Sequence, residues 1–340
     1  MNAQPIVVVA GGAGYVGSVL VPRLLESGYR VRVLDSLVFG LRGLEPVLDR
    51  IEVVEEDIRS VPGSVLRGAD ALVNLAALSN DPTANFRPQL CWDVNAEGAL
   101  RLAKLCIDEG ISRYVYASSS SIYDTRDPST APEACREEDP IRPIGPYSSS
   151  KYEAETRILP LASERFAPVA LRKGTLYGFS PRMRFDLVVN TFVRGAMRDG
   201  TISLHNGGGM WRPLLSVEDA AAAYIRCLEA PAEAIRGEAF NVVHCNESIA
   251  NVAAELRAAC EALGRALCVE STPSPSPVRN YCASERKAQR VLGLESAITI
   301  RESVDKMLHV LPEAGFTDFD NPWYSNIAWM ERTDEEAPPS

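Results

Sequence analysis

Histidine is rare in this sequence, and its cysteines are scattered. Only three of the 340 residues are histidine, eight are cysteine, and no C-x-x-C pair or zinc-type spacing of cysteine and histidine occurs. Because structural zinc sites need such clusters, we expect no metal site. The thiols are expected to be reduced and mostly structural.

Long apolar runs and an excess of positive charge are also missing. The sequence has no run of about 18 or more apolar residues, and its N-terminal "IVVVA" is short and leads directly into glycines. The formal charge of −10 argues against a nucleic-acid surface and against binding to anionic membranes. We therefore expect a cytoplasmic protein that has no nucleic-acid or membrane partner.

The sequence does contain enough apolar residues for a large core, with 46% hydrophobic and 24% charged residues. Through the first half, short apolar runs alternate with amphipathic segments, the clearest of which are the helices expected at 15–27 and 88–109. This alternation is typical of βαβ units and predicts an α/β fold with a parallel sheet. The expected strands are "PIVVVAG", "YRVRVLD", "IEVVEED", "ADALVNLAA", "SRYVYASSS" and "VALRKGTLYG".

The pattern changes near residue 172, beyond which strands become fewer. Further helices are expected at 186–199, 217–229 and 248–263. We therefore divide the chain into a first domain at 1–172 and a smaller α/β region at 173–330. Residues 214–245 are expected to add a strand and a helix to the first domain. The last residues, 331–340, have the composition of a flexible tail.

Three glycines follow the first expected strand, where a helix begins. Gly11, Gly14 and Gly17 allow a tight turn there and let a pyrophosphate approach the helix N-terminus. Asp35 ends the second strand 18 residues after Gly17, where its carboxylate would hydrogen-bond a ribose diol and repel a 2′-phosphate. These features favour NAD over NADP, although the nearby Arg42 leaves some tolerance of NADP open.

The stretch "GPYSSSK" places Tyr147 four residues before Lys151. On a helix these two side chains share one face, so the ammonium group can lower the pKa of the phenol. The pair is therefore a candidate acid/base site, although the same spacing also arises by chance in a long chain.

Five motifs occur in one order along the chain: the G-x-x-G-x-x-G spacing, "NLAA", "VNAEG", the serine-rich "YASSSSIYD" and Tyr-x-x-x-Lys. From about residue 5 to 312 the sequence resembles the extended short-chain dehydrogenase/reductase family, in particular its nucleotide-sugar epimerases and dehydratases. The resemblance implies a Rossmann-type doubly wound parallel sheet that binds NAD, with a smaller α/β substrate-binding domain. It also implies a UDP- or dTDP-linked sugar as the substrate, and a homodimer.

The resemblance assigns roles to individual residues. Tyr147 would be the general acid/base, and Lys151 would hold the nicotinamide ribose. Ser119 would share the proton of the substrate hydroxyl, with Ser118 as the alternative. The cofactor-binding residues would be Gly11, Gly14, Tyr15, Val16, Gly17, Asp35, Asp57, Ile58, Leu75, Ala76, Ala77, Asn95, Tyr147 and Lys151. The substrate-binding residues would be Ser119, Ser121, Thr175, Arg212 and Arg279.

The arginines carry the expected contacts to the substrate. Arg212 and Arg279 match family positions whose arginines bind the diphosphate of the nucleotide sugar. Thr175 stands where many relatives have an asparagine, so the shape of the sugar pocket is left open. Arg182 and Arg184, in "SPRMRFD", are candidates for meeting a carboxylate or a phosphate.

The residues after Ser119 narrow the reaction that the resemblance implies. Dehydratases of this family carry Asp-Glu directly after the catalytic threonine, and decarboxylases carry Glu at the second position, whereas this chain has Ser120-Ser121. The preferred interpretation is an NAD-dependent 4-epimerase, which oxidises a hydroxyl and then reduces the keto sugar from its other face. An NAD(P)-dependent ketoreductase or dehydrogenase of a nucleotide sugar or another small hydroxylated substrate remains an alternative, as does a non-catalytic dinucleotide-binding protein.

Overall fold

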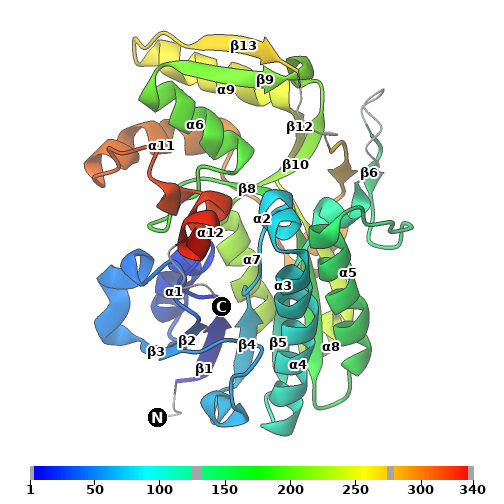
Figure 1. Ribbon diagram of the computed structural model, residues 1–340. Helices are drawn as coiled ribbons and strands as arrows, with labels where there is room; N and C mark the ends of the chain where they lie inside the picture. Colours follow the sequence, from blue (N-terminus) through cyan, green and yellow to red (C-terminus); the bar gives the residue numbers. More distant parts are fainter. Residues whose placement is uncertain (1–3, 125–131, 274–278, 336–340) are drawn as a thin grey trace.

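Seven parallel strands form the sheet at the base of the molecule (Figure 1). The computed structural model describes residues 4–124, 132–273 and 279–335. The strands of this sheet are β1 (Ile6–Ala10), β2 (Arg30–Asp35), β3 (Glu52–Glu55), β4 (Ala71–Asn74), β5 (Arg113–Ser119), β7 (Ala167–Lys173) and β11 (Glu238–Val242). Their order is β11-β7-β5-β4-β1-β2-β3, and every neighbouring pair is parallel. The predicted α/β fold with a parallel sheet is confirmed. Five expected strands belong to it, and the sixth divides into β7 of this sheet and Thr175–Tyr177, which belongs to another sheet.

Helices cover both faces of this sheet, which explains why its strands are continuous apolar runs. Val7 and Val9 pack in the core on one face, and Val8 and Ala10 pack in the core on the other. The first face is covered by α1 (Gly17–Glu26), α7 (Val217–Glu229), α8 (Ala232–Ile235) and α10 (Arg286–Leu292). The second face is covered by α4 (Ala99–Asp108) and α5 (Pro146–Ile158), with α3 (Pro88–Trp92) packed on α5. The expected helices at 15–27, 88–109 and 217–229 are therefore present, the second one interrupted by a π-helical turn at Asp93–Gly98.

A second lobe lies above the sheet in Figure 1 and has its own core. It contains the three-stranded sheet of β8 (Thr175–Tyr177), β10 (Trp211–Ser216) and β12 (Cys245–Ser248), and the pair β9 (Thr201–His205) and β13 (Cys268–Thr272). Its helices are α6 (Val188–Arg198), α9 (Ile249–Ala262) and α11 (Ile300–Glu313). The expected helices at 186–199 and 248–263 correspond to α6 and α9.

Shorter elements lie between these helices and strands. They are α2 (Asp81–Phe86), the paired strands β6 (Ala134–Cys135) and β14 (Cys282–Ala283), and 3₁₀ turns at Arg42–Arg50, Gly63–Leu66, Ser120–Tyr123, Leu159–Leu161, Asn206–Gly208 and Pro322–Tyr324. Across the three described ranges, no helix is both long enough and apolar enough to cross a bilayer.

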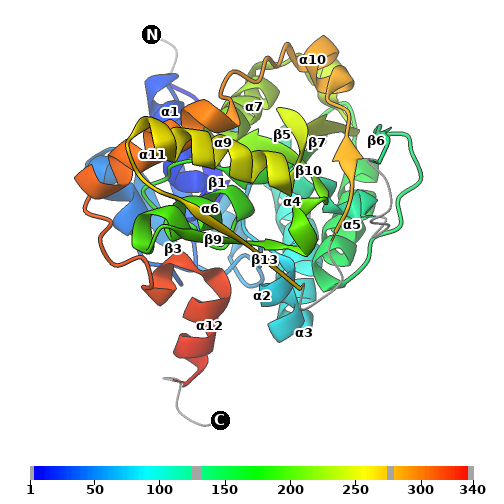
Figure 2. The same cartoon turned by 90° about the horizontal axis from the view of Figure 1, so that it is seen from above.

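The chain ends with α12 (Asn326–Glu335), which lies beside α2 (Figure 2). Residues 331–335 are thus helical, although the sequence predicts a flexible tail from residue 331. The remaining part of the expected tail, 336–340, lies outside the described residues. This position brings the C-terminal helix back to the lower lobe.

Candidate active site

A cavity of about 620 Å³ opens between the two lobes, at the carboxyl ends of β1, β2, β4, β5 and β7. This edge is where doubly wound sheets bind their ligands. The residues from the sequence prediction that line it are Gly11, Gly14, Tyr15, Val16, Gly17, Asp35, Asp57, Ile58, Leu75, Ala76, Ala77, Ser119, Tyr147, Lys151, Thr175 and Arg279. Three others, Asn95, Ser121 and Arg212, do not line it.

The glycine turn after β1 is too tight for side chains. A Cβ atom on Gly11, which has φ +75°, would lie 2.6 Å from the Ala76 nitrogen, and one on Gly17 would lie 2.2 Å from the Gly12 oxygen. No side chain caps the start of α1, so none competes with an anion at this helix end. The turn therefore fits the pyrophosphate of a dinucleotide.

Tyr15 contacts both lobes, through its side chain in the upper lobe and through its backbone in the lower lobe. Its hydroxyl donates to the Gly178 oxygen at 2.7 Å and accepts from Asn190 at 3.1 Å, so the ring is anchored in the upper lobe. Its backbone stays in the glycine turn at the cavity wall. The side chain is thus structural, and only the backbone is free to meet a ligand.

Asp35 is fixed in orientation at the end of β2. Its two oxygens accept hydrogen bonds from the backbone of Ala13 at 3.0 Å and Leu37 at 2.9 Å. Burial raises the pKa of Asp35, and these two hydrogen bonds oppose that change. Asp57, further along the wall, is held in an ion pair with Arg59 at 2.6 Å, and hydrogen bonding to that arginine lowers the pKa of Asp57.

Tyr147, Ser119 and Lys151 lie together at the other end of the cavity. The Ser119 hydroxyl hydrogen-bonds the phenol of Tyr147. The Lys151 Nζ donates to the Ala117 oxygen at 2.9 Å and lies 5.1 Å from the centre of the Tyr116 ring. Burial lowers the pKa of Lys151 to about 8. The three side chains form the arrangement that a general acid/base needs, with a hydroxyl beside it and a cation below it.

The charges around Tyr147 include two arginines. Burial raises the pKa of the phenol, while Ser119, Arg279 and Arg184 lower it. Lys151, which we expect to lower it as well, donates from its ammonium group to the Ala117 oxygen. The arginines beside Tyr147 come from distant parts of the chain.

The four serines after β5 have different partners, which separates their roles. Ser118 donates to the Glu155 carboxylate at 2.7 Å, and Ser120 donates to the Lys173 oxygen at 2.9 Å. Ser121 is buried and accepts a hydrogen bond from Ser119 at 2.9 Å. Ser119 is thus the serine that meets Tyr147, and Ser118 is engaged elsewhere.

Asn95 lies in the π-helical turn and supports the cavity from behind. Its side-chain oxygen accepts from the Leu78 N–H at 2.9 Å, and its amide donates to the Leu78 oxygen at 3.1 Å and to Ser150 at 3.1 Å. Insertions of this kind are frequent at functional sites because they turn one side chain out of helical register. Asn95 therefore fixes the segment after β4 and does not reach the cavity.

The two arginines expected at the diphosphate have different positions. Arg279 lines the cavity, forms ion pairs with Asp81 and with Asp124 at 3.7 Å, and lies 6.0 Å from the Tyr147 ring centre. Arg212 donates to the backbone oxygen of Arg279 and to that of Trp211, and so positions the segment that carries Arg279. Only Arg279 is exposed to the space in which a substrate would lie.

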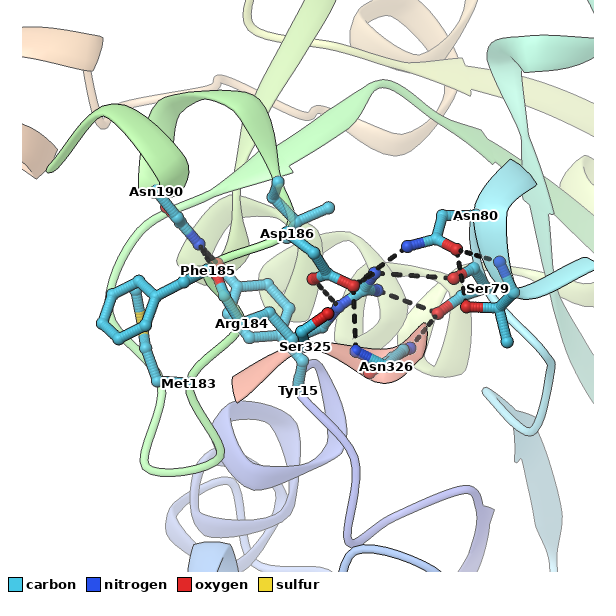
Figure 3. Close-up of polar contacts among 12 residues, drawn as sticks. Tyr15, Ser79, Asn80, Met183, Arg184, Phe185, Asp186, Asn190, Ser325 and Asn326 are labelled. Carbon is cyan, nitrogen blue, oxygen red and sulfur yellow. Dashed lines mark hydrogen bonds and ion pairs between the residues drawn. The ribbon is translucent and has the colours of Figure 1, made fainter. Parts of the chain in front are cut away.

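Arg184 is neutralised within the protein. It forms an ion pair with Asp186 at 2.8 Å and donates to Ser79 at 2.8 Å (Figure 3). Asp186 also accepts from the Asn80 side chain and the Asn326 backbone, which ties α2, the loop before α6 and α12 together. Apart from the Arg184–Asp186 pair, this network is not visible in the sequence, because its other contacts join residues more than 100 positions apart.

Comparisons with known proteins agree with this geometry. The model of the NAD dependent epimerase/dehydratase family matches residues 7–243. The Low-salt glycan biosynthesis protein Agl12 of Haloferax volcanii is 29% identical over 244 residues, or 69% of this chain and 76% of that protein. UDP-glucose 4-epimerase of Streptomyces lividans is 33% identical over 156 residues, which cover 44% of this chain and 45% of the relative, or about half of each. The structure of MoeE5 in complex with UDP-glucuronic acid and NAD superimposes with a TM-score of 0.75 at 26% identity, and the match covers 96% of this chain and 99% of the other.

The chain therefore belongs to the NAD dependent epimerase/dehydratase family, and the resemblance inferred from its motifs is confirmed. It is an enzyme of the extended short-chain dehydrogenase/reductase type, and its cofactor is NAD. The glycine turn, the start of α1 and Asp35 are the parts of the site that fit this cofactor.

Proposed function

We propose that this protein is an NAD-dependent 4-epimerase of a nucleotide sugar. The observation that carries the proposal is the placement of Tyr147 and Ser119 at the cavity, followed by two buried, uncharged serines, Ser120 and Ser121. Oxidation and reduction of a hydroxyl need only a group that takes up and returns one proton. Elimination of water or loss of carboxylate needs further acid or base groups beside the sugar.

The protein's own side chains would act as follows. Tyr147, as the phenolate, takes the proton of the sugar hydroxyl, and Ser119 holds that hydroxyl by a hydrogen bond. The glycine turn, the start of α1 and Asp35 would hold NAD, which would supply the acceptor and later the donor of the hydride. Tyr147 then gives the proton back to the new alcohol. Arg279 would bind the diphosphate of the nucleotide sugar. The diphosphate would then replace Asp81, which is the present ion-pair partner of Arg279.

The acids near Tyr147 are engaged, which supports epimerisation over elimination. Asp81 and Asp124 both form ion pairs with Arg279. Ser118 and Ser120 are bound to groups of the protein. Among the described residues, the catalytic end of the cavity therefore offers Tyr147 as a proton-transfer group, and the carboxylates beside it are ion-paired before a substrate binds.

The test is product analysis with the purified enzyme and a panel of UDP- and dTDP-linked glucose, galactose and glucuronic acid. We expect an isomer of unchanged mass, resolved by chromatography with mass spectrometry, and no net reduction of added NAD. The matched control is Tyr147→Phe, which keeps the ring and should lose about 10²- to 10⁴-fold in rate. A product lighter by water or carbon dioxide would refute the proposal, and stoichiometric reduction of NAD would indicate a dehydrogenase instead.

We also propose that the protein forms a homodimer through the helical layer that contains α4 and α5. These helices lie side by side on one face of the sheet (Figure 1). The Arg157–Glu97 ion pair at 2.5 Å joins α5 to the π-helical turn that precedes α4, and Ile107 is 43% exposed on α4.

A further inference from the structure

Arg182 is a buried cation in the cavity wall without a charged partner. Its side chain is 1% exposed, and its guanidinium carbon lies 3.8 Å from the centre of the Phe39 ring. It donates to the Asn326 side-chain oxygen at 2.8 Å, whereas its Nε has no hydrogen-bond partner among the described residues. Within the same residues no carboxylate forms an ion pair with it. Burying a charge in this way is costly unless an anion pairs with it.

The position of Arg182 indicates which anion would pair with it. Gly43 approaches so closely that a Cβ atom there would lie 2.9 Å from the Arg182 Cβ and 2.3 Å from the Ser18 hydroxyl. Arg182 is therefore beside the first turn of α1, next to the glycine turn that fits a pyrophosphate. The Asp186 and Asp35 carboxylates both act on its charge from nearby, but Asp186 is ion-paired with Arg184 and Asp35 is already hydrogen-bonded by two backbone N–H groups. A phosphate group is the anion that this part of the cavity can hold.

The C-terminal segment crosses the same end of the cavity. The indole N–H of Trp323 donates to the Phe39 oxygen at 2.8 Å, and that of Trp329 donates to the Val38 oxygen at 2.6 Å. Both acceptors lie in the loop that follows β2, and Asp35 is the last residue of that strand. Met330 and Thr333 of α12 line the cavity itself. The segment therefore covers the adenosine end of the site and is joined to the loop that forms its other side.

Asn326 connects Arg182 to the C-terminal segment, residues 323–333, which is called the cover below. Besides accepting from Arg182, its side chain donates to the Ser79 hydroxyl at 3.0 Å, and its backbone N–H donates to Asp186 at 3.1 Å (Figure 3). Three segments far apart in sequence therefore meet at one residue of α12. Any opening of the C-terminal segment would also release the partner that orients Arg182.

We propose that Arg182, oriented by Asn326, binds the phosphates of NAD, and that residues 323–333 close over the adenosine end and retain the cofactor between turnovers. This inference rests on NAD as the cofactor of the family and not on the proposed epimerase reaction. It assigns to Arg182 a role in the cofactor site, where the sequence suggested a contact to a substrate carboxylate or phosphate.

The first test replaces the cation by a side chain of similar length, Arg182→Met. Removing a hydrogen-bonding charge should weaken NAD binding roughly 10- to 100-fold. The apo protein should be as stable as the wild type or more stable, because a buried cation without a counter-charge is replaced by an apolar group. Titration of apo protein with NAD and thermal unfolding of apo and NAD-bound forms give the two readouts. The control is Arg301→Met, which removes an arginine of α11 that is paired with Asp305 away from the cavity.

The expected changes in NAD affinity and in apo-protein stability have opposite signs, which distinguishes a role of Arg182 in NAD binding from a role in stabilising the fold. If Arg182→Met lowers the melting temperature of the apo protein and leaves NAD affinity unchanged, Arg182 is structural and the assignment is wrong. Arg182→Lys keeps the charge without the planar fork and should fall between the wild type and Arg182→Met in NAD affinity.

The second test concerns the cover. Asn326→Ala and Trp329→Ala in the full chain should each accelerate NAD release from the holoenzyme by about 5-fold or more, the effect of losing one hydrogen bond. Release is followed by separating free from bound NAD over time after dilution. The control is Leu263→Ala, which truncates an apolar side chain that is 40% exposed at the end of α9. This variant should release NAD at the wild-type rate. Wild-type rates in both α12 variants would refute the cover.

These experiments also keep the two proposals separate. An enzyme that retains NAD but converts no nucleotide sugar to its epimer would support the cover and refute the proposed reaction. An enzyme that epimerises sugars while exchanging NAD freely with labelled NAD in solution would refute the cover and leave the reaction intact.

Discussion

The groups around Tyr147 shift the pKa of its phenol in opposite directions. Burial raises the pKa of the phenol, Ser119 and Arg279 lower it, and the negative charge of Asp81 raises it. Because Asp81 and Arg279 are themselves an ion pair, each screens the effect of the other on the phenol. The proton affinity of the proposed base is thus set by a pair of charges that the substrate would separate.

We predict opposite changes in the pH profile when either member of this pair is neutralised. The active base is the deprotonated phenol, so kcat rises as the pH rises through the pKa of Tyr147. Arg279→Gln removes a charge that lowers this pKa and should move the rise to higher pH, whereas Asp81→Asn should move it to lower pH. The measurement is kcat against pH at saturating sugar. Shifts of the same sign in both variants would contradict this account of the phenol.

Lys151 is predicted to reduce the stability of the protein without cofactor. Its pKa falls from the ordinary value of 10.5 to about 8 because burial disfavours the ammonium form. Between these two values the unfolded chain binds more protons than the native protein, so the free energy of unfolding rises with pH in this window. The change from 10.5 to about 8 corresponds to roughly 3 kcal/mol.

Lys151→Met should therefore be more stable than the wild type at pH 7 and should lose part of the rise in stability between pH 8 and 10.5. Urea unfolding of apo protein at several pH values measures both effects. Lys306→Met, on the half-exposed side of α11, is the matched control and should keep the wild-type dependence. Equal slopes in Lys151→Met and the wild type would show that burial of this lysine is not costly.

Residues in local motifs could be predicted from the sequence, and residues that act through tertiary contacts could not. Gly11, Asp35 and Tyr147 follow from the spacing of a strand, a turn and a helix, and all three line the cavity. Arg279 was found by position, but its pairing with Asp81 joins segments almost 200 residues apart. Arg182 stood in a recognisable arginine-containing stretch, yet nothing in the sequence indicates that a residue of the last helix orients it.

The helix α5 carries both Tyr147 and Lys151 and is held to the sheet by a buried ion pair. Glu155 on α5 accepts from Arg172 of β7 at 2.5 Å, and Ser118 of β5 donates to the same carboxylate. Arg172 also donates to the hydroxyl of Tyr123 and to the backbone oxygen of Glu137 at 3.0 Å. The position of the catalytic helix thus depends on charges one turn beyond the residues that do the chemistry.

Breaking this pair should be strongly destabilising. Arg172→Met leaves the Glu155 carboxylate buried without its cation and should lower the free energy of unfolding by about 3–5 kcal/mol. The double variant Arg172→Met with Glu155→Leu removes both charges and should recover most of that loss. Chemical denaturation of the three proteins measures the effect. A double variant no more stable than Arg172→Met would show that the loss comes from the hydrogen bonds of Arg172 to Tyr123 and Glu137, and not from its charge pair with Glu155 of α5.

The main elements follow from sequence periodicity, while the small ones do not. Strands such as β1 are buried on both faces and therefore read as unbroken apolar runs, and α7 begins and ends where its apolar pattern does. The π-helical turn at Asp93–Gly98 leaves no such trace, because it changes the register of a helix without changing its composition. The two-residue strands β6 and β14 are defined only by each other.

As a whole, the molecule presents the helical layer of α4 and α5 on the side opposite α1 and α7. We predict a dimer by sedimentation equilibrium at micromolar concentration. Ile107→Lys, which places a charge on the exposed face of α4, should shift the mass toward the monomer, whereas Leu263→Lys at the remote end of α9 should not. A monomeric wild type would refute the interface.

The return of the chain from the upper lobe to the sheet has a consequence for biosynthesis. β11 lies at the edge of the seven-stranded sheet and pairs with β7, but it is separated from β7 in the sequence by much of the upper lobe. During translation β7 therefore leaves the ribosome with one unpaired edge, which is a site for association with other chains until β11 emerges. Nascent chains stalled before residue 238 should accordingly be the ones that chaperones bind, and release should coincide with the emergence of this last strand.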